Sequence, residues 1–410
     1  MSDVRLSPAR LCGTLTVPPS KSAAHRAVLC AALAGQGGIL PKGETLSDDI
    51  AATEEAAANL LDGGSESVTL DCRESGSTLR FLIPLAAALG RETTFTGRGR
   101  LPERPVGVYL ACLPPRGVRC KTAGGLPLTV SGRLAPGEFR LPGNVSSQFV
   151  TGLLLALPLL DGDSSIVLTS PLESAAYVEL TLQAMRAFGV TAERTPSGWR
   201  VPGRQHYRPN PGFTLERDWS QAAFFLAVGM LGGPVSLRGL NPASAQGDRA
   251  AETLFRQFGA KLEWRSGILT AGAGASPAAV PDIDASQIPD LVPVLAAAAA
   301  LLPGKRTRIV RAGRLRLKES DRLAAMAEGL NRLGGHVREL PDGLEIDGVE
   351  RLRGGRAEGF GDHRVVMALA VAALRAESET VVTDAESIRK SYPGFFRDYN
   401  CLGGNAYVMG

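Results

Sequence analysis

Six segments of similar design recur along the chain at a spacing near 70 residues, and this repeat restricts the folds that the chain can adopt. Each segment has a polar or charged start followed by an apolar run of helix length, and most end in Gly. They begin near Ser22, Ser77, Ser147, Ser220, Asp290 and Asp362, with spacings of 55, 70, 73, 70 and 72 residues. Such a sustained period indicates an architecture built from copies of one unit.

A second set of helical segments lies between the first. These segments are amphipathic, end in Gly and lead into strand patterns, as at residues 180–193 (LTLQAMRAFGVTAE) and 251–264 (AETLFRQFGAKLEW). Gly after the last apolar residue is an expected helix stop. The first set is apolar nearly all round and should be buried, whereas the second should cover a surface. We therefore predict an α/β fold with about six units, three in each of two domains, because 410 residues exceed one ordinary core.

Composition excludes several classes of protein. The net charge of +4 is too small to indicate nucleic-acid binding. The longest apolar runs, such as residues 291–302, are too short to span a bilayer. The six cysteines form no C-x-x-C pair and no zinc-ligand spacing, so we expect reduced thiols and no metal site. With no signal or transit pattern at the N-terminus, we expect a cytoplasmic protein.

The functional signal lies at the helix starts, where cations occur repeatedly. Lys21 and Arg26 enter the first apolar helix, Arg80 the second and Arg364 the sixth, while residues 318–322 (KESDR) begin an amphipathic helix. A helix N-terminus carries partial positive charge, which disfavours Lys and Arg unless an anion binds there. Each start alone could be a capped helix with a solvated cation, or a structural ion pair. Together they predict a site for more than one anionic group, that is, phosphates and carboxylates.

Eight ordered motifs carry a family resemblance. The motifs are PPSKSAAHRAVLCAALAG, ESGSTLRFLIPLAAALG, LPERPVG, NVSSQFVTGLLLALPLL, IPDLVPVLAAAAAL, RLRLKESDRL, GDHRVVMALAVAAL and RKSYPGFF. From about residue 12 to about residue 396 they resemble the 5-enolpyruvylshikimate-3-phosphate synthase family, also called 3-phosphoshikimate 1-carboxyvinyltransferase. The resemblance implies two similar domains of three βαβαββ units each, with buried parallel helices (an inside-out α/β barrel) and an active site in the interdomain cleft. We expect residues 1–13 plus 218–410 to form domain 1 and residues 14–217 to form domain 2.

The resemblance also implies a reaction. The enolpyruvyl group of phosphoenolpyruvate would move to the 5-hydroxyl of shikimate 3-phosphate through a tetrahedral intermediate, and phosphate would leave, on the way to chorismate and the aromatic amino acids. No cofactor is implied, because Lys and Arg can stabilise the leaving phosphate. Glyphosate would inhibit by occupying the phosphoenolpyruvate site, since Gly76 stands where a larger side chain obstructs it. We expect a monomer that binds neither nucleic acid nor membrane.

The family's site residues carry over position by position. Those matching the shikimate 3-phosphate site are Lys21, Ser22, Arg26, Ser146, Ser147, Ser174, Tyr177, Asp290 and Lys318. Those matching the phosphoenolpyruvate site are Lys21, Gly76, Arg104, Gln148, Arg322, Arg364 and Lys390. Asp290, Glu319 and Lys21 match the catalytic groups, with Asp290 expected near the 5-hydroxyl and the other two near the methylene carbon. Two carboxylates in different surroundings suit general acid–base catalysis, although the sequence leaves open which group moves which proton.

Some positions depart from the family pattern, and two alternative functions compete with the one that the resemblance implies. Ala175-Ala176 replaces a Lys-containing pair, which puts one Lys contact in doubt, and Arg314 stands where Asn or Glu is usual. The sister enzymes that use UDP-N-acetylglucosamine carry a reactive Cys in the loop matching Gly97–Pro105, and this loop has none. The other alternative is a non-catalytic binder of anionic metabolites, which the filled catalytic positions disfavour.

Overall fold

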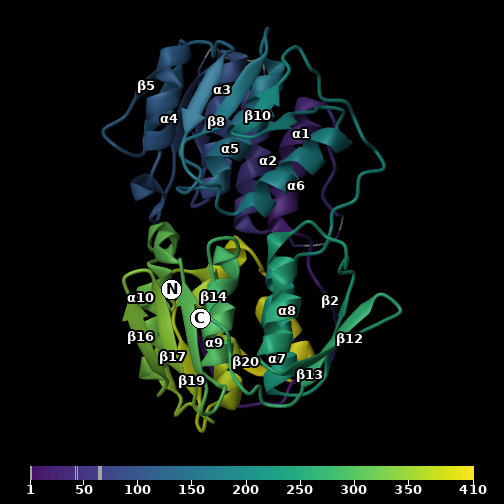
Figure 1. Cartoon of the computed structure of the whole chain (residues 1–410), viewed down its shortest axis with the longest axis vertical. Helices are drawn as coiled ribbons and strands as arrows, with labels where there is room; N and C mark the ends of the chain where they lie inside the picture. The colour runs from purple at the N-terminus through teal and green to yellow at the C-terminus, as the bar shows by residue number, and fades with distance from the viewer. Residues whose placement is uncertain (1, 42, 44, 63–66) are drawn as a thin grey trace. The chain divides into compact units, whose positions relative to one another are not determined.

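The structure is a computed structural model that describes residues 2–41, 43, 45–62 and 67–410 (Figure 1). The chain folds into two compact units: unit 1 comprises Met1–Ser20 and Glu216–Gly410, and unit 2 comprises Lys21–Leu215. The chain thus crosses at 20/21 and 215/216, whereas the sequence-based prediction placed the crossings at 13/14 and 217/218. Strand pairing explains the first difference, because β2 (Gly13–Thr16) pairs in parallel with β11 (Val235–Arg238) of unit 1.

The six predicted apolar helices are all present and form the interior of the units. In unit 2 they are α1 (Lys21–Leu33), α3 (Gly76–Leu89) and α5 (Ser147–Ala156), and in unit 1 they are α7 (Trp219–Leu231), α9 (Val292–Ala299) and α11 (His363–Ala372). Every residue of α7, α9 and α11 is buried, as expected for helices that are apolar nearly all round. Each unit has its own hydrophobic core built around its three helices.

A second helix follows each apolar helix, as the sequence predicted. These helices are α2 (Asp48–Leu61), α4 (Gly107–Cys112) and α6 (Ala175–Ala187) in unit 2, and α8 (Ala250–Gln257), α10 (Arg322–Arg332) and α12 (Phe395–Cys401) in unit 1. In α8 only Ala251 and Phe255 are buried, so this helix is one-sided. After α6 the chain turns at Gly189, whose φ of 79° favours glycine.

Short 3₁₀ helices connect several of these elements. They are η1 (Leu101–Glu103), η2 (Pro114–Arg116), η3 (Leu157–Leu159), η4 (Gly247–Arg249), η5 (Pro289–Leu291), η6 (Gly313–Leu317), η7 (Ala373–Arg375) and η8 (Ala385–Lys390). Among them, η5, η6 and η8 contain charged residues of the candidate site described below.

Five four-stranded sheets with one shared topology occur in the described chain. Unit 2 contributes two, with strand orders β3-β4-β6-β5 and β7-β8-β10-β9, and unit 1 contributes three, with orders β12-β13-β11-β2, β14-β15-β17-β16 and β18-β19-β1-β20. Each sheet contains one parallel pair, as expected for a strand–helix–strand crossover, and two antiparallel pairs. This recurring sheet topology corresponds to the repeat of about 70 residues in the sequence.

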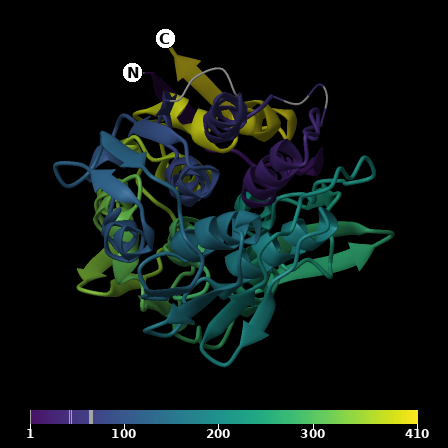
Figure 2. The same cartoon turned by 90° about the horizontal axis from the view of Figure 1, so that it is seen from above.

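The strands are short. In unit 2 they are β3 (Ser67–Asp71), β4 (Glu92–Thr96), β5 (Arg119–Lys121), β6 (Leu128–Ser131), β7 (Glu138–Leu141), β8 (Ser164–Leu168), β9 (Glu193–Thr195) and β10 (Gly198–Val201). In unit 1 the remaining strands are β1 (Asp3–Ser7), β12 (Ala260–Arg265), β13 (Ile268–Ala273), β14 (Ile283–Asp284), β15 (Arg306–Val310), β16 (His336–Leu340), β17 (Gly343–Asp347), β18 (Gly355–Ala357), β19 (Thr380–Val382) and β20 (Asn405–Met409). The two ends of the chain lie side by side, because β1 pairs antiparallel with β20 (Figure 2).

None of the helices in the described chain is long and apolar enough to cross a membrane. All six cysteines, each of which lies in the described part of the chain, are free.

Candidate active site

Several helices in both units begin without the acidic residues that usually occupy a first turn. In α1, α3, α10 and α11 the first turn has none. Ser75, Asp321 and Asp362 cap three of these helices, each side chain accepting a backbone N–H hydrogen bond. Cations near such ends need compensation from carboxylates or from a bound anion. The two units differ in the compensation that they supply.

In unit 2, Lys21 begins α1 and forms an ion pair with the first turn of α2. Its Nζ lies 2.7 Å from Asp49 Oδ2, and the two side chains are 16% and 11% exposed. Sequence reasoning predicted Lys21 as a site residue but missed Asp49, because nothing in the sequence indicates that residues 28 positions apart meet. The ion pair holds the Lys21 ammonium at the helix start.

Arg26 lies one turn further into α1, in surroundings that are polar but uncharged. Its Nε donates to Thr181 Oγ1 (2.8 Å), its Nη1 donates to the Ser22 carbonyl (2.6 Å), and its guanidinium lies 5.2 Å from the ring centroid of Phe81 and 6.0 Å from that of Tyr177. Burial lowers the pKa of Arg26 to about 10. Within the described chain no carboxylate forms an ion pair with this buried cation. The positive charge of Arg26 is therefore available to an anionic ligand.

Gln148 joins the starts of α3 and α5. Its Nε2 donates to Ser77 Oγ (2.9 Å), and its Oε1 accepts from Arg80 Nη1 (2.6 Å). Ser146 caps α5 by accepting from the Gln148 backbone N–H, and Ser147 is the first helical residue. The predicted residues Ser146, Ser147 and Gln148 therefore share one polar corner with Arg80, whose position at a helix start was noted but which was not predicted as a site residue.

Gly76 and Arg104 lie against each other. A Cβ at Gly76 would lie 2.7 Å from the Arg104 guanidinium, which is closer than real side chains approach. Arg104 follows η1, and 8% of its surface is exposed. The absence of a side chain at Gly76 is therefore what allows the guanidinium to cover the start of α3.

Ser174 and Tyr177 surround the start of α6. Ser174 is 2% exposed and has a φ of 54°, unusual for a residue with a side chain. Its carbonyl accepts the Tyr177 backbone N–H (3.1 Å). Ala175 and Ala176 form the intervening first turn. The Tyr177 ring in turn lies beside Arg26, so this pair belongs to the same half-site as α1.

In unit 1, Arg322 is the centre of a charged network. Its Nε lies 2.8 Å from Asp362 Oδ2, its Nη2 lies 2.9 Å from Glu319 Oε2, and its Nη1 lies 3.0 Å from Asp290 Oδ1. Arg322 is 1% exposed and Asp362 is fully buried. Burial alone lowers the pKa of Arg322, but the three carboxylates outweigh it and raise that pKa above its ordinary value. Asp362 was seen in the sequence only as part of a helix start.

Asp290, at the middle of η5, is held by three cations. Arg364 Nη2 lies 3.2 Å from its Oδ2, and Lys318 Nζ lies 3.7 Å from its Oδ1, in addition to the Arg322 contact. Burial raises the pKa of Asp290, but Arg364, Lys318 and Arg322 together hold it well below the usual range. Asp290 is consequently a carboxylate at neutral pH.

For Lys318, unlike Asp290, burial outweighs the neighbouring charges and shifts the pKa towards the neutral form. Burial lowers its pKa to about 8, although Asp290 acts to raise it. Arg314 adds to the lowering of this pKa and donates through Nη2 to the Ser286 carbonyl (2.5 Å). Arg314 thus contributes positive charge near Lys318.

Arg364 connects Asp290 to the start of α7. Its Nη1 donates to Ser220 Oγ (2.6 Å) and to the Asp290 carbonyl (3.0 Å). Lys390, at the end of η8, donates through Nζ to the Gly361 carbonyl (2.7 Å), one residue before Asp362. The structure therefore brings together all the predicted site residues that belong to unit 1: Asp290, Lys318, Glu319, Arg322, Arg364 and Lys390.

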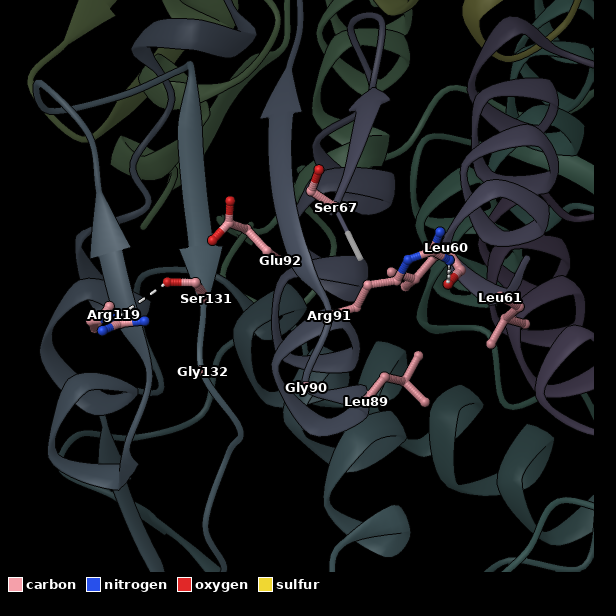
Figure 3. Close-up of a pocket in the computed structure, with 10 residues that line it drawn as sticks. All are labelled: Leu60, Leu61, Ser67, Leu89, Gly90, Arg91, Glu92, Arg119, Ser131 and Gly132. Atoms are coloured by element: carbon pink, nitrogen blue, oxygen red, sulfur yellow. Dashed lines mark hydrogen bonds between the residues drawn. The ribbon is translucent and has the colours of Figure 1, made fainter. Parts of the chain in front are cut away.

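None of the predicted site residues lines either of two cavities in the described part of unit 2. The larger, of about 760 Å³, is lined by Leu60 and Leu61 at the end of α2, by Leu89 at the end of α3, and by Arg91 and Arg119 (Figure 3). The smaller, of about 260 Å³, adjoins β8, β9 and β10. Within each unit the predicted residues lie instead at helix N-termini or, like Arg104 and Lys390, beside such a terminus. The described residues contain no group of three or more His, Cys, Asp or Glu side chains that could hold a metal ion.

Comparisons with known proteins find one family along nearly the whole chain. The model of the family described as EPSP synthase (3-phosphoshikimate 1-carboxyvinyltransferase) matches residues 6–399. The chain is 43% identical to the 3-phosphoshikimate 1-carboxyvinyltransferase of Clostridium kluyveri and 40% identical to that of Clostridium novyi, in each case over 98% of both chains.

Solved structures share the fold. An EPSP synthase from Acinetobacter baumannii superposes with a TM-score of 0.76 at 24% identity, over 100% of both chains. The enolpyruvyl transferase NikO from Streptomyces tendae gives a TM-score of 0.76 at 18% identity, over 100% of this chain and 99% of its own. The likeness to these structures bears on fold alone, and it agrees with the predicted two-domain α/β architecture.

Proposed function

The chain belongs to the EPSP synthase family, and from this premise we propose that it transfers the enolpyruvyl group of phosphoenolpyruvate to the 5-hydroxyl of shikimate 3-phosphate, releasing phosphate. The observation that carries the proposal is the Asp290–Arg322–Glu319 network. Two carboxylates, held by one buried guanidinium and surrounded by Lys318 and Arg364, combine acid–base groups with cations for anionic substrates.

Shikimate 3-phosphate is assigned mainly to the unit 2 half-site. The proposed contacts are Lys21, Ser22, Arg26, Ser146, Ser147, Ser174 and Tyr177, with Asp290 and Lys318 from unit 1. The uncompensated charge of Arg26 and the hydroxyls at the starts of α5 and α6 suit a phosphate group.

Phosphoenolpyruvate is assigned to cations from both units. The proposed contacts are Lys21, Gly76, Arg104, Gln148, Arg322, Arg364 and Lys390. Guanidinium groups bind carboxylate and phosphate through paired hydrogen bonds, and the contact between Gly76 and Arg104 would set the space available for this substrate. Glyphosate, as an anionic phosphonate, is proposed to compete for the same contacts.

The proposed mechanism uses the charge state of Asp290. As a carboxylate, Asp290 accepts the 5-hydroxyl proton while the hydroxyl oxygen attacks C2 of phosphoenolpyruvate. Glu319, with Lys21, supplies a proton to the methylene carbon, which becomes a methyl group in the tetrahedral intermediate. In the elimination the methyl group returns one proton to this pair, the C2–O bond to phosphate breaks, and the departing phosphate takes up the proton that Asp290 accepted, which restores the carboxylate. The protons and the leaving group of each step are accounted for without a cofactor. Lys and Arg stabilise the negative charge that develops on the departing phosphate.

A phosphate-release assay tests the proposal. Purified protein is mixed with phosphoenolpyruvate and either shikimate 3-phosphate or UDP-N-acetylglucosamine, and phosphate is measured. We expect release only with shikimate 3-phosphate. Release with UDP-N-acetylglucosamine would assign the chain to the sister reaction, and no release with either would make it a non-catalytic binder. We further propose that the enzyme acts as a monomer in the cytoplasm, which sedimentation and cell fractionation can check.

A further inference from the structure

His25 is a buried histidine in α1 that the mechanism above does not use. Its side chain is almost completely enclosed, with 1% of the residue exposed. Burial, together with the charges of Lys21 and Arg26, lowers the pKa of His25 well below its ordinary value, so the ring is neutral and carries one proton. A neutral imidazole has one donor nitrogen and one acceptor nitrogen. Which nitrogen is the donor depends on the groups that surround the ring.

Two contacts join α1 to α2, one helical turn apart. The outer contact is the ion pair in which Lys21 Nζ lies 2.7 Å from Asp49 Oδ2. The inner contact places His25 Nδ1 2.7 Å from Thr53 Oγ1, and Thr53 is completely buried. Residues four apart share one face of a helix, so each helix contributes both of its contacts from the same face. His25 therefore continues into the interior the connection that the ion pair begins.

The Thr53 hydroxyl extends this connection to the start of α3. Its Oγ1 lies 2.6 Å from Thr78 Oγ1, and the Thr78 hydroxyl donates to Ser75 Oγ (2.7 Å). Ser75 is the N-cap of α3 and also accepts the Thr78 backbone N–H (3.2 Å). All of these side chains are buried. A buried chain of hydrogen bonds thus runs from His25 to the residue that directly precedes Gly76.

The hydroxyl protons give this chain a direction. Thr78 has one hydroxyl proton and donates it to Ser75, so its 2.6 Å contact with Thr53 requires the Thr53 proton. Thr53 then has to accept from His25, which places the imidazole proton on Nδ1. The Asp49 carbonyl, 3.2 Å from Thr53 Oγ1, can only accept and leaves this direction unchanged. His25 Nε2, which none of the described residues hydrogen-bonds, is the unprotonated nitrogen, so the ring has no N–H without an acceptor.

We propose that His25 is a positioning residue: by donating from Nδ1 to Thr53, it fixes the start of α3 for the binding of phosphoenolpyruvate. The inference rests on the proposed function, in which Gly76 and the Arg104 guanidinium that lies against it contact this substrate. His25 itself does not touch the substrate. Without its donor the hydroxyl chain loses its single direction, and the start of α3 is held less precisely.

Three substitutions break or keep the chain. His25→Leu removes the donor, and Thr53→Val removes the hydroxyl that accepts from it with little change in shape. His25→Asn keeps a donor, because the amide nitrogen of Asn is bonded to Cγ, as Nδ1 of histidine is. We expect His25→Leu and Thr53→Val to raise the KM for phosphoenolpyruvate about fivefold to tenfold, as the loss of one buried hydrogen bond would. Their kcat and their KM for shikimate 3-phosphate should stay within about twofold, and His25→Asn should keep all three values within about twofold.

Thr94→Val is the matched control. It makes the same change in unit 2, where the Thr94 hydroxyl forms a pair with that of Thr129 (2.9 Å) between β4 and β6, and it should leave KM unchanged. A wild-type KM for phosphoenolpyruvate in both His25→Leu and Thr53→Val would overturn the inference. So would a His25→Asn enzyme as impaired as His25→Leu. If His25→Leu does not fold, Thr53→Val alone decides the kinetic test.

The position of the imidazole proton can be measured without turnover. Long-range ¹H–¹⁵N NMR spectra of the wild type show which ring nitrogen is protonated, and the signals of His25 are identified by their absence from His25→Asn. We expect a protonated Nδ1 and an unprotonated Nε2, and the reverse would overturn the inference. A wild type that releases no phosphate would reject the proposed function. Normal release by the wild type, with equal KM in all variants, would reject the role of His25 alone.

Discussion

The two half-sites hold their buried cations in different ways. In unit 1, Arg322 lies between Asp290, Glu319 and Asp362, so positive and negative charges are nearly matched before any ligand binds. In unit 2, Arg26 is held by a threonine hydroxyl, a backbone carbonyl and aromatic rings. The difference supports the proposed division of tasks, in which unit 2 offers positive charge to a phosphate and unit 1 holds the carboxylates that move protons.

The largest expected effect comes from removing a carboxylate of unit 1. Asp290→Asn should lower kcat by about 10²–10⁴-fold, because the proposed general base for the 5-hydroxyl is lost. Steady-state phosphate release measures the effect. Asp282→Asn is the control, because Asp282 lies near Asp290 in the sequence but forms only an exposed ion pair with Arg308. This variant should leave kcat unchanged. Normal turnover in Asp290→Asn would remove the acid–base role from unit 1.

The stability of the two units should respond differently to loss of their central arginines. Arg322→Met leaves three buried or partly buried carboxylates without their shared partner and should cost about 3–5 kcal/mol of unfolding free energy. Arg26→Met leaves only neutral acceptors unpaired and should cost about 1–2 kcal/mol. Urea unfolding followed by circular dichroism compares them. Equal losses of unfolding free energy in the two variants would show that the charge environments of Arg322 and Arg26 do not differ as described.

A smaller effect on kcat/KM should appear as the pH is raised, because Lys318 loses its charge. Its pKa of about 8 means that the free enzyme loses this positive charge as pH rises through 8, whereas an ordinary lysine would keep it. The kcat/KM for shikimate 3-phosphate should therefore fall above pH 8, by about tenfold at pH 9.5. In Lys318→Arg the decline should shift to higher pH, since guanidinium stays protonated. Identical profiles for both proteins would exclude Lys318 as the titrating group.

The smallest effect concerns the contact between Gly76 and Arg104. The Cβ in Gly76→Ala must displace the guanidinium, which is the flexible end of its side chain, so folding should be preserved. The KM for phosphoenolpyruvate should rise about threefold to tenfold, and glyphosate, inhibitory in the wild type, should inhibit the variant less. Gly107→Ala is the control, because a Cβ there meets no atom within 4 Å. A wild type insensitive to glyphosate, or two variants that behave alike, would contradict this account.

Much of the fold could be predicted because its repeat is visible along the chain. The apolar helices begin within two residues of the predicted starts, as at Ser147 for α5 and Ser220 for α7, since polar caps and apolar runs are local signals. The crossing between units was placed seven residues early, at 13 instead of 20. β2 belongs to unit 1 only because it pairs with β11 more than 200 residues away, and pairing at that range leaves no local pattern.

The candidate site was predictable in its residue types but not in its pairings. Cations at helix starts were visible, and the family resemblance supplied Asp290 and Glu319. The partners Asp49 of Lys21 and Asp362 of Arg322 lie 28 and 40 positions away and become evident only in three dimensions.

The affinity for shikimate 3-phosphate alone tests the division of tasks most directly. Calorimetric titration of the wild type, Arg26→Met and Glu319→Gln compares the two half-sites without turnover. We predict that Arg26→Met binds at least about thirtyfold more weakly, whereas Glu319→Gln binds within about threefold of the wild type although its kcat falls at least about a hundredfold. Equal weakening in both variants, or normal binding by Arg26→Met, would contradict the account.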